Sequence, residues 1–152
     1  MSDAVGGPRV KLNDGRSMPL VGLGTWKSKP GEVKAAVKAA VAAGYRHIDC
    51  AWIYKNEGEV GAALTELFEE GTVTREDLWI TSKLWNDFHA PGDVASACDK
   101  TLEALRITHL DLYLIHWPVV SNCTGDTLTP SIADTWTAME ALVAAGKCKS
   151  SV

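Results

Sequence analysis

Four ionisable side chains lie at the ends of successive short apolar segments of the chain. Asp49 ends one segment and is followed closely by Tyr54, Lys83 lies near the end of the next, and His116 ends a third. Because the carboxyl ends of parallel strands meet at one edge of a sheet, we expect these four side chains to converge there. A lysine near the end of a buried strand is costly unless a carboxylate is close, and Asp49 is placed to supply one.

Side chains of these four types can deliver a proton to an oxygen atom. A tyrosine phenol is a weak acid at neutral pH, and a neighbouring ammonium group favours its ionised form. A carboxylate keeps the lysine charged and in place, while an imidazole can orient a carbonyl group or share the proton. The set therefore predicts protonation of a carbonyl oxygen as a nicotinamide cofactor delivers hydride, or the reverse reaction.

Simpler interpretations of the same residues remain open at this point. Asp49 and Lys83 could form only a structural ion pair, and His116 could be a hydrogen-bonded core histidine. His47 shares a strand face with Asp49 and is interpreted as structural. A metal site made of His47, Asp49 and His116 would lack further well-placed ligands, so we predict no metal ion. The other two histidines are assigned no role: His89 and His109.

Strand and helix patterns alternate along the chain after a short hairpin. The hairpin is predicted at about 9–20, with strands at 20–24, 46–49, 78–84, 110–116 and 148–152. Helices are predicted from Pro30 to Gly44 and at 57–70, 91–105 and 132–145, with a polar loop at 118–130. This order implies parallel strands joined by right-handed crossovers, in either a doubly wound sheet or part of a βα barrel. The segment GLG at 22–24 lacks the third glycine of the dinucleotide fingerprint, which argues against a Rossmann-type phosphate site.

Five segments together resemble the aldo-keto reductase family. They are GLGTW (22–26), GYRHIDCA (44–51), YKNE (54–57), ITSKLW (80–85) and LYLIHWP (112–118). The likeness runs from about Val10 to the last residue, and it implies an α/β fold of the (β/α)8 TIM-barrel type, of the aldose and aldehyde reductase kind. Each segment is a weak signal alone, and the combination is specific.

The resemblance implies a role for each site residue. Tyr54 would be the proton donor, Lys83 and Asp49 would tune it, and His116 would orient the carbonyl of an aldehyde, ketone, sugar or polyol substrate. The substrate pocket would be lined by Trp26, Trp85, His116 and Trp117. The cofactor, NADPH with NADH as the alternative, would be contacted by Gly24, Thr25, Trp26 and Asp49.

The length of 152 residues limits how much of such a barrel the sequence contains, because a complete one takes about 250 residues. We therefore expect one partial barrel domain over 1–152, with a hairpin at about 9–20, βα units at about 21–145 and the start of a fifth strand at 148–152. The family's next motif, a Ser-Asn pair after the fifth strand that holds the nicotinamide amide, is not among the residues that follow Cys148. The alternative function is thus a catalytically incompetent truncated isoform or fragment that acts by association with another chain. Unpaired strand edges would favour self-association.

Composition excludes several other classes of protein. Hydrophobic residues make up 46% and charged residues 22%, with a net charge of −4, which excludes a disordered tail and a basic nucleic-acid-binding module. No run reaches the roughly 18 apolar residues of a membrane span. The four cysteines are widely spaced and are interpreted as reduced thiols, which favours a cytoplasmic protein. The small-molecule substrate is implied by the family resemblance alone.

Overall fold

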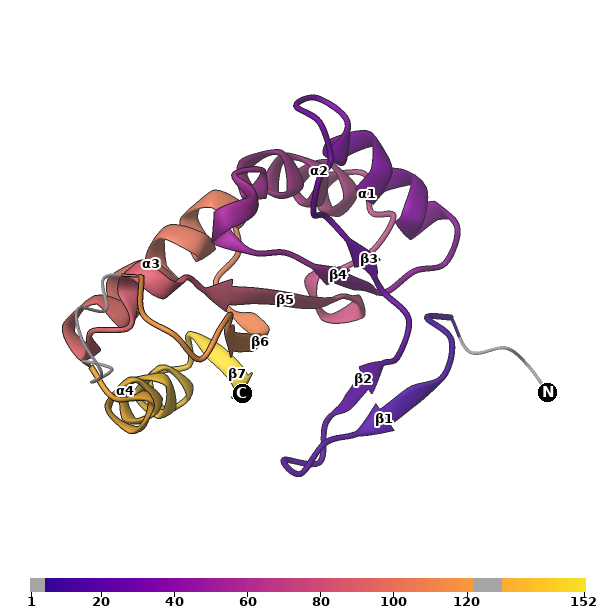
Figure 1. Cartoon of the computed structure of the whole chain (residues 1–152). Helices are drawn as coiled ribbons and strands as arrows, with labels where there is room; N and C mark the ends of the chain where they lie inside the picture. Colours follow the sequence, from indigo (N-terminus) through magenta and orange to yellow (C-terminus); the bar gives the residue numbers. More distant parts are fainter. Residues whose placement is uncertain (1–4, 122–129) are drawn as a thin grey trace.

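A short hairpin precedes a parallel sheet that is flanked by helices. The computed structural model describes residues 5–121 and 130–152 (Figure 1). The hairpin consists of β1 (Arg9–Lys11) and β2 (Ser17–Pro19), which pair antiparallel. The sheet strands are β3 (Leu23–Gly24), β4 (His47–Asp49), β5 (Trp79–Leu84), β6 (Leu110–Ile115) and β7 (Cys148–Ser151). The helices are α1 (Val33–Ala42), α2 (Glu57–Glu69), α3 (Pro91–Leu105) and α4 (Ile132–Ala144).

The strand order distinguishes between the two predicted sheet types. The five strands lie in the order β3-β4-β5-β6-β7, and each pair of neighbours is parallel. Each new strand is thus added on the same side of the last, without the reversal that defines a doubly wound sheet. The four helices follow one another around the sheet (Figure 1). The α/β fold of successive barrel units with an amino-terminal hairpin is confirmed.

Local sequence accounts for the helices that cover the sheet. In α1, Val33, Val37 and Val41 recur at helical spacing and are at most 2% exposed. The chain leaves this helix through Gly44, whose φ of 97° favours glycine. Helix α2 approaches α3 closely at Gly61, where a Cβ atom would lie 2.3 Å from the carbonyl oxygen of Ala104. The spacing of apolar residues and the small side chain together fix how these helices pack.

The hairpin is attached to the amino-terminal ends of the sheet strands. The carbonyl oxygen of Pro19 in β2 lies 3.1 Å from Nδ1 of His47 at the start of β4. Farther along, the Ser150 hydroxyl of β7 donates a hydrogen bond to the carboxylate of Asp14 in the hairpin loop. The hairpin therefore reaches from the second strand of the sheet to its last. Its residues Arg9, Arg16 and Ser17 line one pocket with Leu78, Trp79 and Asp111, at the starts of β5 and β6 and thus at the edge opposite the predicted site.

The observed bounds differ from the predicted ones mainly at one strand and at the start of the first helix, which begins at Val33 rather than at Pro30. The strand predicted at 20–24 is paired with the sheet only at Leu23–Gly24. The backbone N–H of Leu20 instead donates to the carbonyl of Pro8 at 2.9 Å, which continues the hairpin, and the chain packs closely on the His47 ring at Gly22. Most of the loop predicted at 118–130 lies outside the described residues. The same holds for Cys123, whereas Cys50, Cys98 and Cys148 are free and buried. No helix within the described ranges combines the length and apolar character that a membrane crossing needs.

Candidate active site

Lys83 and Asp49 form an ion pair at the carboxyl edge of the sheet. The Lys83 Nζ donates to Oδ1 of Asp49 at 2.7 Å and to the carbonyl oxygen of Cys50 at 2.7 Å. The Lys83 side chain is 12% exposed, whereas that of Asp49 is 35% exposed. Both residues end neighbouring parallel strands, β4 and β5, as the sequence predicted. Among the described residues, the second carboxylate oxygen of Asp49 has no hydrogen-bond donor, so it is available to a ligand.

Tyr54 lies beside this ion pair, on the 3-10 turn η1 (Trp52–Tyr54) that follows β4. The Lys83 Nζ is 5.2 Å from the centroid of the half-buried Tyr54 ring. The turn ends at Lys55, whose φ of 57° is left-handed and sends the chain into α2. The phenol is thereby held next to an ammonium group that is itself largely shielded from water.

His116 completes the group predicted from the sequence. Its backbone N–H donates to the Leu84 carbonyl at 3.0 Å, which places the residue directly after β6 at the same edge. The His116 ring meets the Tyr54 ring edge-on, with centroids 5.9 Å apart. Burial, followed by the charge of Lys83, holds the pKa of His116 below its usual value. The imidazole is therefore neutral at pH 7 and can act as a hydrogen-bond donor or acceptor.

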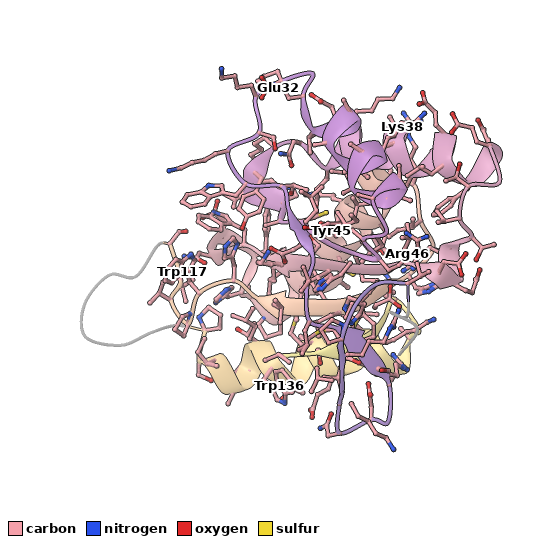
Figure 2. The ribbon with its side chains drawn as sticks, turned by 90° about the vertical axis from the view of Figure 1, so that its right-hand side faces the viewer. Glu32, Lys38, Tyr45, Arg46, Trp117 and Trp136 are labelled. Carbon is pink, nitrogen blue, oxygen red and sulfur yellow. The ribbon has the colours of Figure 1, made fainter. Side chains whose placement is uncertain are left out.

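An aromatic pocket of about 330 Å³ opens above these residues. It is lined by Trp26, Ile53, Tyr54, Trp85, His116 and Trp117. Trp26 and Trp117 are 65% and 55% exposed, and Trp117 lies on the left side of Figure 2, away from the hairpin. The structure thus brings all four predicted pocket residues together and adds Ile53. The only signal for Ile53 in the sequence is its position next to Tyr54.

The predicted cofactor contacts differ in what they can offer to a ligand. Gly24 is exposed, and no atom lies within 4 Å of the position that a Cβ would take. Thr25 is fully buried, and both its backbone N–H and its hydroxyl donate to the Asp49 carbonyl at 3.1 Å. The Thr25 side chain is therefore directed to the interior. Gly24, Trp26 and the free oxygen of Asp49 face open space, which fits the nicotinamide and ribose end of a dinucleotide.

His47, considered above as a metal ligand, is hydrogen-bonded within the protein instead. Both ring nitrogens of His47 have protein partners, the carbonyl of Pro19 at 3.1 Å and the Thr81 hydroxyl at 2.9 Å. Within residues 5–121 and 130–152, no group of three or more His, Cys, Asp or Glu side chains is arranged to hold a metal ion.

Known proteins resemble this chain over nearly its whole length. The model of the Aldo/keto reductase family matches residues 20–151. Aldo-keto reductase family 1 member A1 of Homo sapiens is 54% identical over 150 residues, which cover 90% of this chain and 46% of the human protein. Aldo-keto reductase family 1 member A1-A of Danio rerio is 51% identical over 154 residues, covering 93% of this chain and 47% of that protein.

Solved structures show the same relationship. An aldose reductase from Schistosoma japonicum superposes with a TM-score of 0.87 at 50% identity, over 95% of this chain and 52% of that one. An aldo-keto reductase from Bombyx mori, in complex with NADP, gives a TM-score of 0.88 at 40% identity, over 97% and 50% of the two chains. The chain spans about half the length of these relatives.

Proposed function

The chain belongs to the aldo/keto reductase family, and we propose that it carries the proton-transfer site of an NADPH-dependent carbonyl reductase, with Tyr54 as the proton donor. The substrate class is a small aldehyde or ketone, or a sugar or polyol in the reverse direction. The names of the relatives support this class, and the NADP in the Bombyx mori structure supports the cofactor. NADPH rather than NADH, a cytoplasmic location and a single partial-barrel domain over 1–152 belong to the same proposal.

Tyr54 and Lys83 perform the proton transfer in this proposal. When the phenol gives its proton to the carbonyl oxygen, the remaining phenolate is stabilised by the Lys83 ammonium group, 5.2 Å from the ring centroid. Asp49 and the Cys50 carbonyl hold that ammonium group in place. Gly24, Trp26 and Asp49 would hold a reduced nicotinamide cofactor, which would supply the hydride for such a reduction.

His116 and the tryptophans position the substrate. A neutral imidazole can donate one N–H to the carbonyl oxygen without adding a second positive charge beside Lys83. Trp26, Trp85 and Trp117 offer flat apolar walls that exclude water from the reacting carbonyl. The observation that carries the proposal is the Lys83 side chain, only 12% exposed, whose ammonium group bonds to the Asp49 carboxylate and lies 5.2 Å from the centroid of the Tyr54 ring, which lines this pocket.

Replacing the phenol tests the proposal. The chain is co-expressed with the second half of the Homo sapiens relative, and aldehyde-dependent NADPH oxidation is followed by the absorbance of the reduced nicotinamide. Tyr54→Phe is expected to lower turnover by about 10²–10⁴-fold, the usual contribution of a general acid. NADPH binding, followed by quenching of tryptophan fluorescence, is expected to persist.

A matched control separates this effect from general damage. Tyr45 is 38% exposed and lies outside the aromatic pocket, so Tyr45→Phe is expected to leave turnover unchanged. Full turnover in Tyr54→Phe would contradict its assignment as the proton donor.

A second candidate function is association with another chain, and the sheet edges favour it. Within the described residues, β3 and β7 each pair with only one sheet strand. Leu20 and Val21 beside β3 are 59% and 50% exposed, and Val152 after β7 is 67% exposed. Unpaired edges with apolar neighbours are sites at which another strand can add. In this role the chain alone would bind NADPH weakly and sediment as a dimer or larger species; a stable monomer at micromolar concentration would contradict it.

A further inference from the structure

Glu57 places a carboxyl group in the interior next to the candidate active site. It is the first residue of α2 and is 4% exposed. Its Oε1 accepts a hydrogen bond from the Ser82 hydroxyl at 2.6 Å, and its Oε2 accepts one from the Thr101 hydroxyl at 3.2 Å. One carboxyl group therefore connects α2, β5 and α3.

The two proton-transfer residues are close to this connection in the chain. Glu57 follows Tyr54 by three residues, and Ser82 directly precedes Lys83. Because successive side chains of a strand point to opposite faces, the Ser82 hydroxyl lies on the face of β5 opposite the Lys83 ammonium. The hydrogen bond from Ser82 to Glu57 thus ties the turn that carries Tyr54 to the strand that carries Lys83.

We propose that Glu57 is a positioning residue, and that its ionised carboxylate holds Tyr54 and Lys83 in the arrangement required for proton transfer. The inference rests on the function proposed above. Asn56 supports the same turn, since its side-chain amide donates to the Thr25 carbonyl at 2.8 Å. The turn is therefore held from both sides, by Asn56 toward β3 and by Glu57 toward β5.

Burial, opposed by the groups around it, makes the ionisation state of Glu57 responsive to pH near neutrality. Burial raises the pKa of Glu57 to about 7, although its hydrogen bonds to Ser82 and Thr101 and the charges of Lys83 and Lys55 favour the carboxylate. The surrounding titratable groups are Cys50 after β4, Lys55 on the turn, Lys83 on β5, Cys98 on α3 and Tyr113 on β6. Burial raises the pKa of both thiols and of the Tyr113 phenol, so these three groups are neutral. The two lysines are then the only charges of this set that balance the carboxylate.

Protonation of Glu57 changes the connection as well as the charge. A carboxylate accepts from both hydroxyls, whereas a carboxylic acid has a proton to donate and fewer accepting sites. The protonated oxygen accepts more weakly and its proton needs an acceptor of its own, which favours reversal of one of the two hydroxyl hydrogen bonds, and the negative charge behind β5 is lost. The positions of Tyr54 and Lys83 should therefore change together as Glu57 titrates.

An NMR titration of the 152-residue chain tests this inference without any cofactor or turnover. The ring signals of Tyr54 and the side-chain signals of Lys83 are followed across the neutral pH range. We expect both to show one step with a midpoint near pH 7, the pKa of Glu57. The pKa of His116 is lowered, so its own step falls on the acid side and is separable.

Three variants decide the origin of that step. Glu57→Gln should abolish it, whereas Glu69→Gln, which removes an exposed carboxylate from the same helix, should leave it unchanged. Ser82→Ala removes a hydrogen bond that favours the carboxylate and should move the midpoint to higher pH, a result that stands even if Glu57→Gln does not fold. Absence of the step in the unmodified chain, its persistence in Glu57→Gln, or an unmoved midpoint in Ser82→Ala would overturn the inference. Carbonyl reduction could still hold in each of those cases, so the two proposals fail separately.

Discussion

Two ion pairs of nearly equal length lie at opposite edges of the same sheet. At the carboxyl edge, Lys83 and Asp49 are 2.7 Å apart, and at the amino edge Arg75 and Asp111 are 2.8 Å apart. The cations are similarly shielded, with side chains 12% and 13% exposed. The carboxylates differ, since Asp49 is 35% exposed and Asp111 only 10%.

The partners of the amino-edge pair come from the backbone around it. Arg75, on the 3-10 turn η2 (Arg75–Asp77), also donates to the carbonyls of Leu78 at 2.9 Å and His109 at 2.8 Å. The same oxygen of Asp111 accepts from the backbone N–H of Ile80 at 2.9 Å. This pair fixes the starts of two strands. The carboxyl-edge pair leaves an accessible carboxylate oxygen and an adjacent phenol, so similar chemistry stabilises the fold at one edge and is available to a ligand at the other.

Of the changes at the two edges, removing the Asp111 carboxylate should have the largest effect on the free energy of unfolding. Asp111→Ala leaves the Arg75 guanidinium buried without its counter-charge, which should lower the free energy of unfolding by about 3 kcal/mol. Urea unfolding measures the loss. Asp99→Ala breaks an exposed pair with Lys147 and is expected to cost well under half as much. Equal losses in the two variants would show that the amino-edge pair does not hold the strands.

A methyl group at Gly22 should disturb the amino edge from the hairpin side. Its Cβ would lie 2.8 Å from Cγ of His47, so Gly22→Ala should lower the free energy of unfolding by about 2 kcal/mol through overpacking. Gly58→Ala is the control, because Gly58 lies in α2 with no atom near its Cβ position and alanine favours a helix. In denaturant unfolding, the free energy of unfolding should fall in Gly22→Ala and rise in Gly58→Ala. A neutral Gly22→Ala would mean that the His47 ring is free to move.

Neutralising Asp49 should cost little stability and most of the function. Asp49→Asn keeps an amide oxygen that can accept from the Lys83 ammonium group, and the Cys50 carbonyl accepts from it as well, so we expect a loss of about 1.5 kcal/mol in the free energy of unfolding. NADPH oxidation by the chain co-expressed with the second half of the Homo sapiens relative should fall sharply, because the Asp49 carboxylate no longer holds the Lys83 ammonium group beside Tyr54. A stability loss matching that of Asp111→Ala would instead favour a purely structural ion pair at this edge.

The smallest effect concerns the histidines at the two edges. Burial is the main cause that lowers the pKa of both His47 and His116, and Lys83 is the second cause for His116 but the last for His47. Because the unfolded chain binds these protons more readily, each histidine stabilises the fold above its unfolded pKa of about 6.5, and this stability is lost as the pH falls below it. Lys83→Met should therefore raise the pKa of His116 more than that of His47 in an NMR titration. Equal shifts in the pKa values of the two histidines would contradict the conclusion that Lys83 acts mainly on His116.

Features set by local sequence were predicted well. The apolar spacing of Val33, Val37 and Val41, the stop at Gly44 and the opening of α3 at Pro91 each depend on neighbours in the chain. The expected convergence of Asp49, Tyr54, Lys83 and His116 follows from one rule, that parallel strands end at a common edge. Strand order, by contrast, could not be derived from alternation alone and left two sheet types open.

Burial of single polar residues was not visible in the sequence. Glu57 looks like an ordinary acidic residue in the first turn of a helix, and only the packing of α2 against β5 and α3 buries it. His89, to which the sequence assigns no role, is fully buried, and its backbone carbonyl accepts from the Thr135 hydroxyl at 2.7 Å. In both cases residues distant in the chain bury the side chain, so no local sequence pattern predicts its burial.

The bond between Asp14 and Ser150 joins residues 136 positions apart. Contacts of such long sequence separation form late in folding, because a long loop must close first, whereas neighbouring βα units close short loops. During synthesis, which proceeds from the amino terminus, the hairpin is made early, but Asp14 has no partner in β7 until Ser150 has left the ribosome. The hydrogen bond between Asp14 and Ser150 can therefore form only after β7, the fifth strand of the sheet, has been added.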